Sequence, residues 1–325
     1  MISNEQFQEA LSRFGLGDFV EATPISGGLF GQNVFVVSTR GQYVLRGAPH
    51  YEWQFPKEKF MCDLLHEKTQ APVAWPYLLD PNTDIFGWSY LLMPRLRGES
   101  VRKEGRNAAD RLGIARAMGE NLARMHGLTW PFAGEYELTT NTIQPFAHGW
   151  TAWVISDLRL WLEKAHNHSR QTNEADALWV ESVIRQAQDA LTEPFEACFV
   201  MNDYNPGNVV IERQGSNWCV SGLFDLMEGY FGDGEADLMR PFADCLDEGK
   251  QQDTTLARAF ARSYWHHETP RPGFAARYAL YMLRDRLIIW EYGTRPGNNW
   301  FSHDWSLRRY AEPYIRSYER LDLTG

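Results

Sequence analysis

The chain has 325 residues, of which 44% are hydrophobic and 23% charged, as is typical of a globular protein with a sizeable core. It contains no run of about 18 apolar residues, so no transmembrane helix is predicted. The net charge of −10 argues against nucleic acid as a partner, because phosphates repel an acidic surface. The first ten residues, MISNEQFQEA, lack the basic and apolar regions of a secretory signal, so the expected location is the cytoplasm.

The four cysteines, Cys62, Cys198, Cys219 and Cys245, are widely spaced and form no Cys-x-x-Cys pair. This spacing supports neither a zinc site nor a disulfide framework. We therefore expect the cysteines to be buried, reduced thiols.

The N-terminal part of the chain has the pattern of several strands and one helix. Residues 33–38 and 43–46 are rich in β-branched and aromatic side chains, and the segment between them is typical of a hairpin turn. Pro56 suits the first turn of a helix that we expect to end near Lys68. Residues 88–93 form another expected strand, which the following proline ends.

The remainder has mainly helical patterns. Asn107 is suited to cap a helix that reaches about His126, because Leu112, Ala115, Met118, Leu122 and Met125 share one of its faces. Further helices are expected over residues 150–166, 173–191, 253–267 and 273–291, with a β-rich interruption over 199–224. We therefore predict an α+β, bilobal fold. A small β-rich lobe would cover residues 1–94, a larger helical lobe residues 95–325, and a hinge would lie near residues 93–96.

The segment NDYNPGN, residues 202–208, is the most informative part of the chain. Asp203 and Asn208 lie five positions apart on a Pro-Gly loop just before an expected strand. Phosphoryl transfer uses such a pair, because the carboxylate accepts the proton of the attacking hydroxyl and the amide oxygen helps to hold Mg²⁺. Asp225 ends an apolar run at a hairpin-like distance, where a second metal carboxylate is expected. Each feature alone also fits a turn or a strand end, but their combination favours a kinase.

Two segments carry a resemblance to a known family. Residues 200–211 resemble the catalytic loop of the aminoglycoside phosphotransferase family, and residues 224–238 resemble its metal-binding segment. That family shares its fold with choline kinases and, more distantly, with protein kinases. The resemblance implies that ATP is the phosphate donor and that Mg²⁺ is required. It also implies that Asp203 is the catalytic aspartate, that Asn208 and Asp225 are metal ligands, and that Asp237 is structural. Met201 departs from the family, which usually has a supporting histidine there.

The N-terminal lobe resembles the family's nucleotide-binding lobe. Residues 25–36 resemble its glycine-rich turn, where Gly27, Gly28 and Gly31 would let backbone N–H groups approach phosphates. The segment that contains Met93 and Arg95 resembles the family's hinge, whose backbone would contact adenine.

Arg46 takes the position at which kinases have a strand lysine, so we expect it to contact phosphate. Glu58, on the following helix, is its expected partner, and Glu52 and Glu67 are the other candidates.

Several functional classes stay open. Only eleven residues separate Asp225 from Asp237, which leaves little room for the peptide-docking segment of a protein kinase. A non-catalytic nucleotide-binding module would be expected to lack one of the three polar residues of the motif. A kinase of choline, homoserine or a sugar cannot be separated from an antibiotic kinase by these motifs.

The favoured acceptor is a hydroxylated small molecule with an amine, bound near the C-terminal helices. The carboxylates that could pair with the amine are Glu228, Asp233, Glu235, Asp244, Asp247 and Glu248, and the tryptophans that could contact it are Trp265, Trp290, Trp300 and Trp305.

Overall fold

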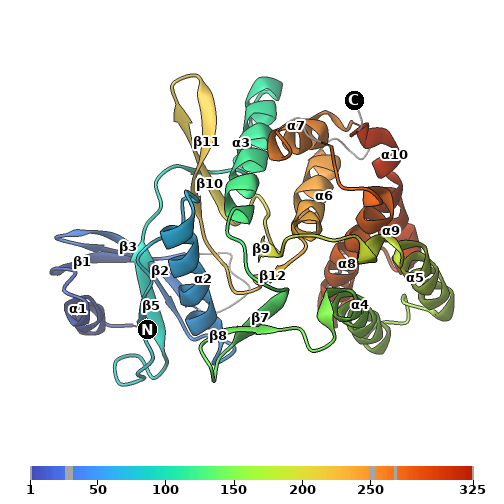
Figure 1. Cartoon of the computed structure of the whole chain (residues 1–325). Coiled ribbons are helices and arrows are strands. Elements are labelled where there is room, and N and C mark those ends of the chain that lie inside the picture. Colours follow the sequence, from blue (N-terminus) through green and yellow to red (C-terminus); the bar gives the residue numbers. More distant parts are fainter. Residues whose placement is uncertain (1, 26–31, 249–252, 267–268, 324–325) are drawn as a thin grey trace.

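A computed structural model describes residues 2–25, 32–248, 253–266 and 269–323 of the chain. Figure 1 shows two lobes: a sheet with two helices, in blue and cyan, and a larger, mainly helical part, from green to red. The described residues form three sheets, and the strands paired within them are antiparallel. The predicted bilobal α+β fold is confirmed.

The N-terminal sheet has five strands in the order β1-β2-β3-β5-β4. Their bounds are β1 (Phe19–Pro24), β2 (Gln32–Ser38), β3 (Gly41–Gly47), β4 (Leu78–Asp80) and β5 (Tyr90–Pro94). The strands β2 and β3 pair along their whole length and turn at residues 38–41, so the predicted hairpin is present. Because β5 follows β3 in the sheet, the hinge begins beside the strand that carries Arg46.

The two helices of this lobe cover opposite faces of the sheet. On one face, Leu11 of α1 (Asn4–Arg13) belongs to a hydrophobic cluster with Val36 and Leu92. On the other face, Met61 of α2 (Gln54–Lys68) belongs to the main core together with Leu91. Leu91 and Leu92 point in opposite directions because side chains alternate along a strand. The helix α2 therefore joins the sheet to the core of the larger lobe.

The prediction of one helix in this lobe is wrong, because α1 is a second one. Its start carries a capping box, in which Ser3 Oγ accepts from the Gln6 N–H and the Gln6 side chain accepts from the Ser3 N–H. The predicted helix is α2, which begins at Gln54, so that Pro56 lies within its first turn.

The larger lobe begins with α3 (Ala108–His126). Asn107 caps it as predicted, since Asn107 Oδ1 accepts a 2.9 Å hydrogen bond from the Asp110 N–H. The other predicted helices overlap α4 (Gly149–His168), α5 (Glu174–Ala187), α7 (Thr255–Tyr264) and α8 (Phe274–Thr294). The elements of this lobe that were not predicted include β7 (Gly134–Glu137), β8 (Thr142–Pro145), α6 (Met239–Glu248), α9 (Leu307–Arg316) and α10 (Tyr318–Leu321).

The predicted β-rich interruption contributes to two small sheets. The hairpin of β10 (Val209–Gln214) and β11 (Asn217–Leu223) pairs with β6 (Glu99–Ser100), which follows the hinge. The strand β9 (Cys198–Val200) pairs with β12 (Tyr230–Gly232), in a sheet completed by β7 and β8. The segment 201–208 therefore crosses from one sheet to the other, and both of its ends are held by strands.

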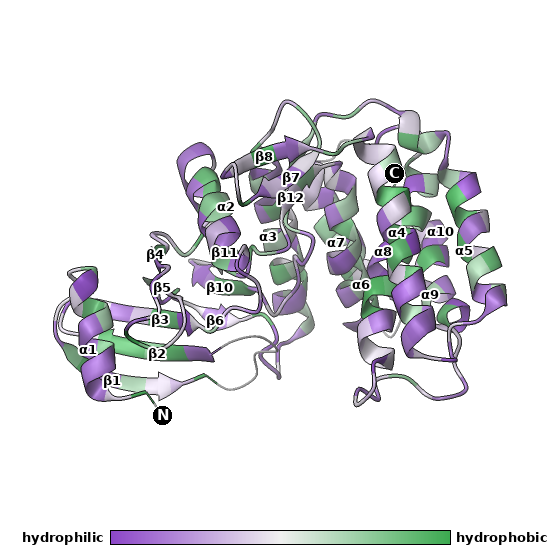
Figure 2. Ribbon diagram, turned by 90° about the horizontal axis from the view of Figure 1, so that it is seen from below, coloured by the Kyte–Doolittle hydropathy of each residue, from purple (hydrophilic) through white to green (hydrophobic). Residues whose placement is uncertain are grey.

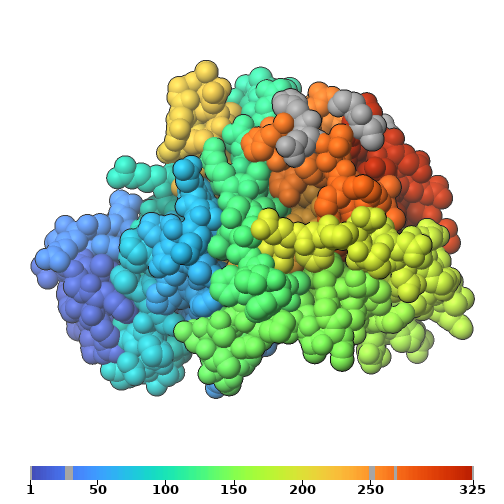
Figure 3. Space-filling model, in the orientation of Figure 1, coloured from blue at the N-terminus to red at the C-terminus, as the bar shows by residue number. Residues whose placement is uncertain are grey.

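The segment from residue 127 to residue 195 covers much of one face of the molecule, in green to yellow in Figure 3, between α2 and the C-terminal helices. Its contact with the N-terminal lobe includes Phe60 of α2 and Tyr136 of β7, whose ring centroids lie 5.2 Å apart.

Figure 2 shows the hydrophobic strand β2 between β1 and β3 in the N-terminal sheet.

Within the described ranges, no helix combines the length and the hydrophobicity that crossing a bilayer requires. All four cysteines are free. Cys62 and Cys198 are buried as expected, but Cys219 and Cys245 are only partly buried, so the prediction of burial is wrong for those two.

Candidate active site

The loop that carries Asp203 is held by its backbone. Asp237 accepts hydrogen bonds from the N–H groups of Met201, at 2.7 Å, and Asn202, at 2.8 Å. Asn202 has a left-handed backbone with φ 66°, which asparagine tolerates better than most residues, and its Oδ1 accepts from Arg284 Nη1 at 2.8 Å. The structural role expected of Asp237 is therefore to fix the entry into the loop. Met201, which takes the place of the family's histidine, is fully buried.

Asp203 and Asn208 meet within this loop. Asn208 Nδ2 donates to Asp203 Oδ2 at 2.9 Å and to the Asp203 carbonyl oxygen at 3.0 Å. Asn205 closes the turn, because its Nδ2 donates to the same carbonyl at 3.1 Å and its Oδ1 accepts from the Gly207 N–H at 2.7 Å. The amide of Asn208 thus orients the carboxylate of Asp203 and keeps its own Oδ1 for another partner.

The carboxylate of Asp203 has a mixed electrostatic environment. Burial raises its pKa, while the nearby guanidinium of Arg240 and the amides of Asn205 and Asn208 oppose that rise. Arg240 Nη2 lies 3.8 Å from Asp203 Oδ1, and Arg240 Nε is anchored by Asp285 Oδ1 at 2.7 Å. A carboxylate whose pKa is raised is a stronger proton acceptor than an exposed aspartate.

The hairpin of β10 and β11 brings Asp225 to the same place. Asn208 immediately precedes β10 and Asp225 lies two residues after β11, so the antiparallel pairing juxtaposes them. The Phe224 N–H donates to the Asn208 carbonyl at 3.3 Å, which ties the two loops together. Asp225 has a left-handed backbone with φ 67°, and its Oδ1 accepts from Arg46 Nη2 at 3.3 Å.

Arg46 on β3 pairs with Glu58 on α2, as predicted, and neither Glu52 nor Glu67 takes that place. Arg46 Nη1 donates to Glu58 Oε2. Glu58 is fully buried, and burial raises the pKa of its carboxyl while Arg46 opposes the rise. A buried charge of this kind is costly unless paired, so Glu58 fixes Arg46 with one guanidinium nitrogen directed at Asp225.

Several of these groups line one cavity of about 640 Å³ between the lobes, whereas Glu58 lies behind Arg46 and is not on its wall. The predicted residues on its wall are Arg46, Met93, Arg95, Asp203, Asn208 and Asp225. Apolar residues, among them Val44, Leu96, Phe224 and Met227, also line it. The wall therefore combines apolar surface that suits a base with charged groups that suit phosphates. Gly27, Gly28 and Gly31 lie outside the described residues.

The hinge differs in one detail from the prediction. The backbone N–H of Arg95 donates to the Gln42 carbonyl at 2.9 Å, so this donor is engaged within the lobe and not directed at an adenine edge. The guanidinium of Arg95 lies over the ring of Phe35, 4.1 Å from its centroid, and both side chains line the cavity. Arg95 therefore contributes a wall of the cavity through its side chain.

The charged end of the cavity fits a magnesium ion. Asn208 Oδ1 and the carboxylate of Asp225 are oxygen donors on adjacent loops, and both residues line the cavity. Mg²⁺ in phosphoryl-transfer enzymes is held by one or two protein oxygens together with phosphate oxygens and water. The donor set is therefore of the right kind and number for a metal shared with a nucleotide.

The structure adds residues that the motifs did not indicate. Arg240, on α6, contacts Asp203, and Arg102, after the hinge, donates to Asn205 Oδ1 at 3.3 Å and lines the cavity. Arg284, on α8, holds the loop at Asn202. These arginines come from three distant elements of the chain, so no local spacing reveals them.

Comparisons with known proteins concern the sequence and the fold of the chain as a whole. A sequence model of the phosphotransferase enzyme family matches residues 21–273, which is most of the chain. A putative aminoglycoside phosphotransferase from Ralstonia eutropha has a similar structure, with a TM-score of 0.69, 16% identity, and coverage of 98% of this chain and 99% of that chain. A putative fructosamine-3-kinase from Thermobifida fusca is also similar, with a TM-score of 0.66 and 15% identity. That match covers 98% of this chain and 99% of that chain.

A third similar structure is a thermostable mutant of an aminoglycoside phosphotransferase in a ternary complex with ADP and hygromycin B. It has a TM-score of 0.66 and 16% identity, and the match covers 95% of this chain and 97% of that chain. At these identities the structural likeness concerns the fold, whereas the family match rests on the sequence. The chain belongs to the phosphotransferase enzyme family.

Proposed function

We propose that the protein transfers the γ-phosphate of ATP, with Mg²⁺, to a hydroxyl group of a small molecule that carries an amine. The observation that supports this proposal best is the convergence on one cavity of Asp203, Asn208, Asp225 and Arg46, which Glu58 holds in place. A nucleotide-binding module without catalysis has no need of a carboxylate that is oriented by an amide and made more basic by burial.

In this proposal, Asp203 accepts the proton of the attacking hydroxyl while the new phosphorus–oxygen bond forms and the bond to the ADP oxygen breaks. Asn208 orients Asp203, and Arg240 keeps its carboxylate ionised. Arg46 binds a phosphate oxygen, in a position set by Glu58. Asn208 and Asp225 would hold Mg²⁺, which when bound neutralises negative charge on the phosphates.

The carboxylates that the sequence suggests for the amine are not equally available. Arg271 and Arg277 engage Asp233 and Glu235, the hydroxyl of Tyr314 donates to Asp247, and Arg111 pairs with Glu248. These four carboxylates already have partners within the protein, so we do not propose them as partners of the amine. Within the described residues, neither Glu228 nor Asp244 makes a side-chain ion pair or hydrogen bond, although the charge of Lys57 acts on Glu228 and that of Arg240 on Asp244.

The tryptophans are not equivalent either. Trp290 is fully buried in the core and donates to Thr172 Oγ1, and the partly buried Trp265 packs edge-on against Phe274 at the edge of the core. Trp300 is exposed. The preference for a cationic acceptor therefore rests on Glu228, an exposed residue near Asp203, Asp225 and Lys57. Desolvation and the two aspartates raise the pKa of its carboxyl, and Lys57 opposes that rise.

The test is a Mg²⁺-ATP assay on matched acceptors, for example glucosamine against glucose, at low and moderate salt. We expect the amine to be the better substrate, with an advantage that falls as salt rises. The Asp203→Asn variant is the control for contaminating kinases. Equal rates for both sugars, with no salt effect, would replace this proposal with a sugar kinase.

A metabolite kinase is the second candidate, and one observation favours it. The structure resembles a putative fructosamine-3-kinase as well as aminoglycoside phosphotransferases. A kinase that acts on sugar-derived amines would use the same site. The acceptor assay above distinguishes a metabolite kinase from an antibiotic kinase by the amine that is phosphorylated fastest.

A further inference from the structure

An open cavity of about 570 Å³ lies at the surface of the larger lobe between α3 and α7, the helices that run side by side in Figure 1. The two backbones touch, because a Cβ at Gly119 of α3 would lie 2.2 Å from the carbonyl oxygen of Phe260 on α7. We call this cavity the α3–α7 groove, and its lining residues on α3 are Leu112 and Arg116. The direct backbone contact fixes its two walls relative to each other.

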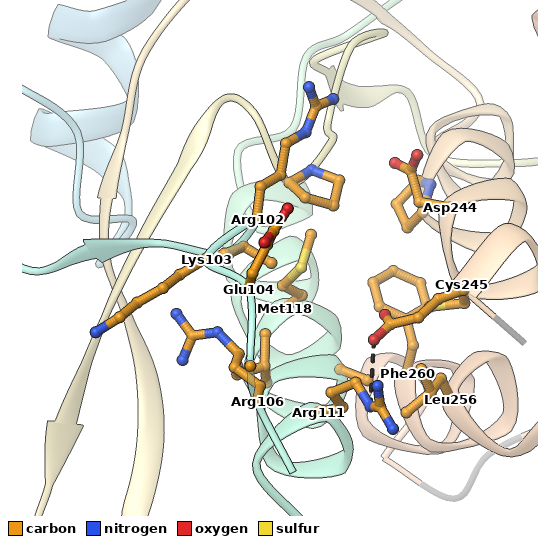
Figure 4. A pocket seen from close by; sticks show the side chains of 17 residues that line it. Arg102, Lys103, Glu104, Arg106, Arg111, Met118, Asp244, Cys245, Leu256 and Phe260 are labelled. Atoms are coloured by element: carbon orange, nitrogen blue, oxygen red, sulfur yellow. Dashed lines mark ion pairs between the residues drawn. The ribbon is translucent and has the colours of Figure 1, made fainter. Parts of the chain in front are cut away.

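The groove is separate from the other cavities of the molecule. Leu256 and Phe260, which Figure 4 shows on α7, line a different cavity, which α3 and α6 also enclose. The α7 residues that line the groove recur at helical spacing on another face, and they are Thr255, Arg258, Ala259, Arg262 and Ser263. No described residue lines both the groove and the nucleotide cavity, so a ligand in the groove is independent of the site of phosphoryl transfer.

The wall of the groove is positively charged. Its described lining residues include three arginines and no carboxylate: Arg258 and Arg262 lie one turn apart on α7, and Arg116 comes from α3. Among the residues that the structure describes, none forms a side-chain ion pair or hydrogen bond with these three guanidinium groups. The chain as a whole has a net charge of −10, so a cluster of this sign stands against the average of the surface. Like charges brought together repel, and an anion between them would remove that cost.

The carboxylates that flank the groove in sequence have other contacts. Asp253 Oδ1 accepts from the Thr255 N–H at 2.8 Å at the start of α7, and the charge of Arg258 acts on this carboxylate. Glu120, one turn after Arg116 on α3, pairs with Arg124 at 3.8 Å. The protein itself therefore balances the charge of the groove only in part.

We propose that the α3–α7 groove binds a small polyanion that carries two or three linked phosphate groups. A guanidinium group donates to phosphate oxygens in pairs, so Arg258 and Arg262 would bind successive phosphates along α7 while Arg116 closes on them from α3. The hydroxyl of Ser263 adds a donor on the same wall.

The shape of the groove favours a soluble ligand over a membrane surface. A cavity of about 570 Å³ is larger than a single phosphate needs and lies in the range of small-molecule sites. Among its described lining residues there is no large exposed hydrophobic side chain of the kind that inserts into a bilayer.

The test is calorimetric titration of the full chain with pyrophosphate, in EDTA so that no metal bridges the ligand to the nucleotide cavity. We expect one site in wild type, with an affinity that falls as salt rises and exceeds the affinity for orthophosphate. Arg258→Gln/Arg262→Gln should weaken binding by about tenfold for each arginine. Arg46→Gln/Glu58→Gln, which neutralises both members of the buried pair at the nucleotide cavity, should leave it unchanged.

The matched control is Arg308→Gln/Arg316→Gln on α9, which removes the same charge from two exposed arginines that pair with Glu312. It should bind pyrophosphate as wild type does. The groove arginines make no ion pair within the described residues, so their replacement should not lower the melting temperature of the free chain. Pyrophosphate should raise the melting temperature of wild type and of the control, but not that of Arg258→Gln/Arg262→Gln.

ADP, titrated into Arg46→Gln/Glu58→Gln, separates two sources of the diphosphate group. Binding as tight as that of pyrophosphate supports a site for a nucleotide diphosphate, and weaker binding supports one for free pyrophosphate.

Four results would overturn the site. They are no binding of pyrophosphate to wild type, unchanged binding in Arg258→Gln/Arg262→Gln, an equal loss in the α9 control, and a loss confined to Arg46→Gln/Glu58→Gln. Orthophosphate bound as tightly as pyrophosphate would refute the requirement for linked phosphates. Phosphatidylserine vesicles that retain wild type but not Arg258→Gln/Arg262→Gln, with no binding of pyrophosphate, would replace the soluble ligand with a membrane surface.

Discussion

Arg240 is expected to set the pH at which the enzyme loses activity. Its Nη2 lies 3.8 Å from Asp203 Oδ1. At an effective dielectric constant of about 20, two unit charges at that distance attract by about 4 kcal/mol. The real contribution is smaller, because Asp203 is one-third exposed and Arg240 is bound more closely to Asp285. We therefore expect Arg240 to lower the pKa of Asp203, against the rise that burial causes.

The perturbation is Arg240→Gln, which keeps a polar side chain at this position and removes its charge. Asp285 keeps a partner, because Arg286 Nε donates to it at 2.9 Å. Catalysis needs ionised Asp203, so a higher pKa moves the acidic limb of the activity profile to higher pH. The expected result is an acidic limb of kcat/KM that lies at higher pH than in wild type, with a small change well above that limb.

The assay is a coupled measurement of ADP release from pH 5 to pH 9, with a saturating coupling system at each pH. Arg309→Gln serves as the matched control, because Arg309 is exposed and pairs with Asp304, remote in sequence from the loop. An acidic limb in Arg240→Gln that coincides with that of wild type would refute the electrostatic role of Arg240.

The other predictions concern the loop and the nucleotide cavity. Asp203→Ala should lower kcat by about 10²–10⁴-fold, measured in single turnover, while nucleotide binding by calorimetry survives. Asp225→Ala should weaken Mg²⁺-dependent nucleotide binding, so equal affinities for MgATP would make Asp225 structural. Arg46→Ala should raise the KM for ATP more than the KM for the acceptor. Asp237→Ala should lower the melting temperature and kcat together, because two N–H groups of the loop lose their acceptor. Thermal melts and initial-rate measurements test this prediction.

Much of the site could be predicted because its main parts are local in sequence. Asp203 and Asn208 lie in one loop, and the hairpin that follows returns the chain to Asp225, so spacing alone placed all three together. The Arg46–Glu58 pair could be predicted for a similar reason, because a strand and the next helix bring the two side chains together. The cap at Asn107 could also be predicted, because its side chain bonds to the N–H of Asp110, only three residues later.

What could not be predicted depends on packing between distant segments. Arg240 reaches Asp203 only because α6 lies against the catalytic loop, and the sequence does not specify that approach. The acidic residues Asp233 and Glu235 looked available for a substrate, but Arg271 and Arg277, some 36 to 42 residues later, engage them. Charge counting along the chain cannot distinguish such paired carboxylates from a free one such as Asp244.

Some elements that were not predicted have a recognisable pattern in the sequence. In α6, the buried residues Met239, Phe242, Ala243 and Leu246 recur at helical spacing, which predicts an amphipathic helix. In α1, the Ser3–Gln6 capping box was equally readable. The strands β7 and β8 are only four residues each, which is too short for a period of two to stand out.

The most direct test of phosphoryl transfer by Asp203 is ³¹P NMR of the purified chain with MgATP and a panel of amino-sugars and amino alcohols. The account predicts that at least one acceptor gives a phosphomonoester resonance in equal amount to the ADP formed, and that Asp203→Asn gives neither. Tight MgATP binding with no phosphomonoester for any acceptor, or the same product from Asp203→Asn, would contradict it.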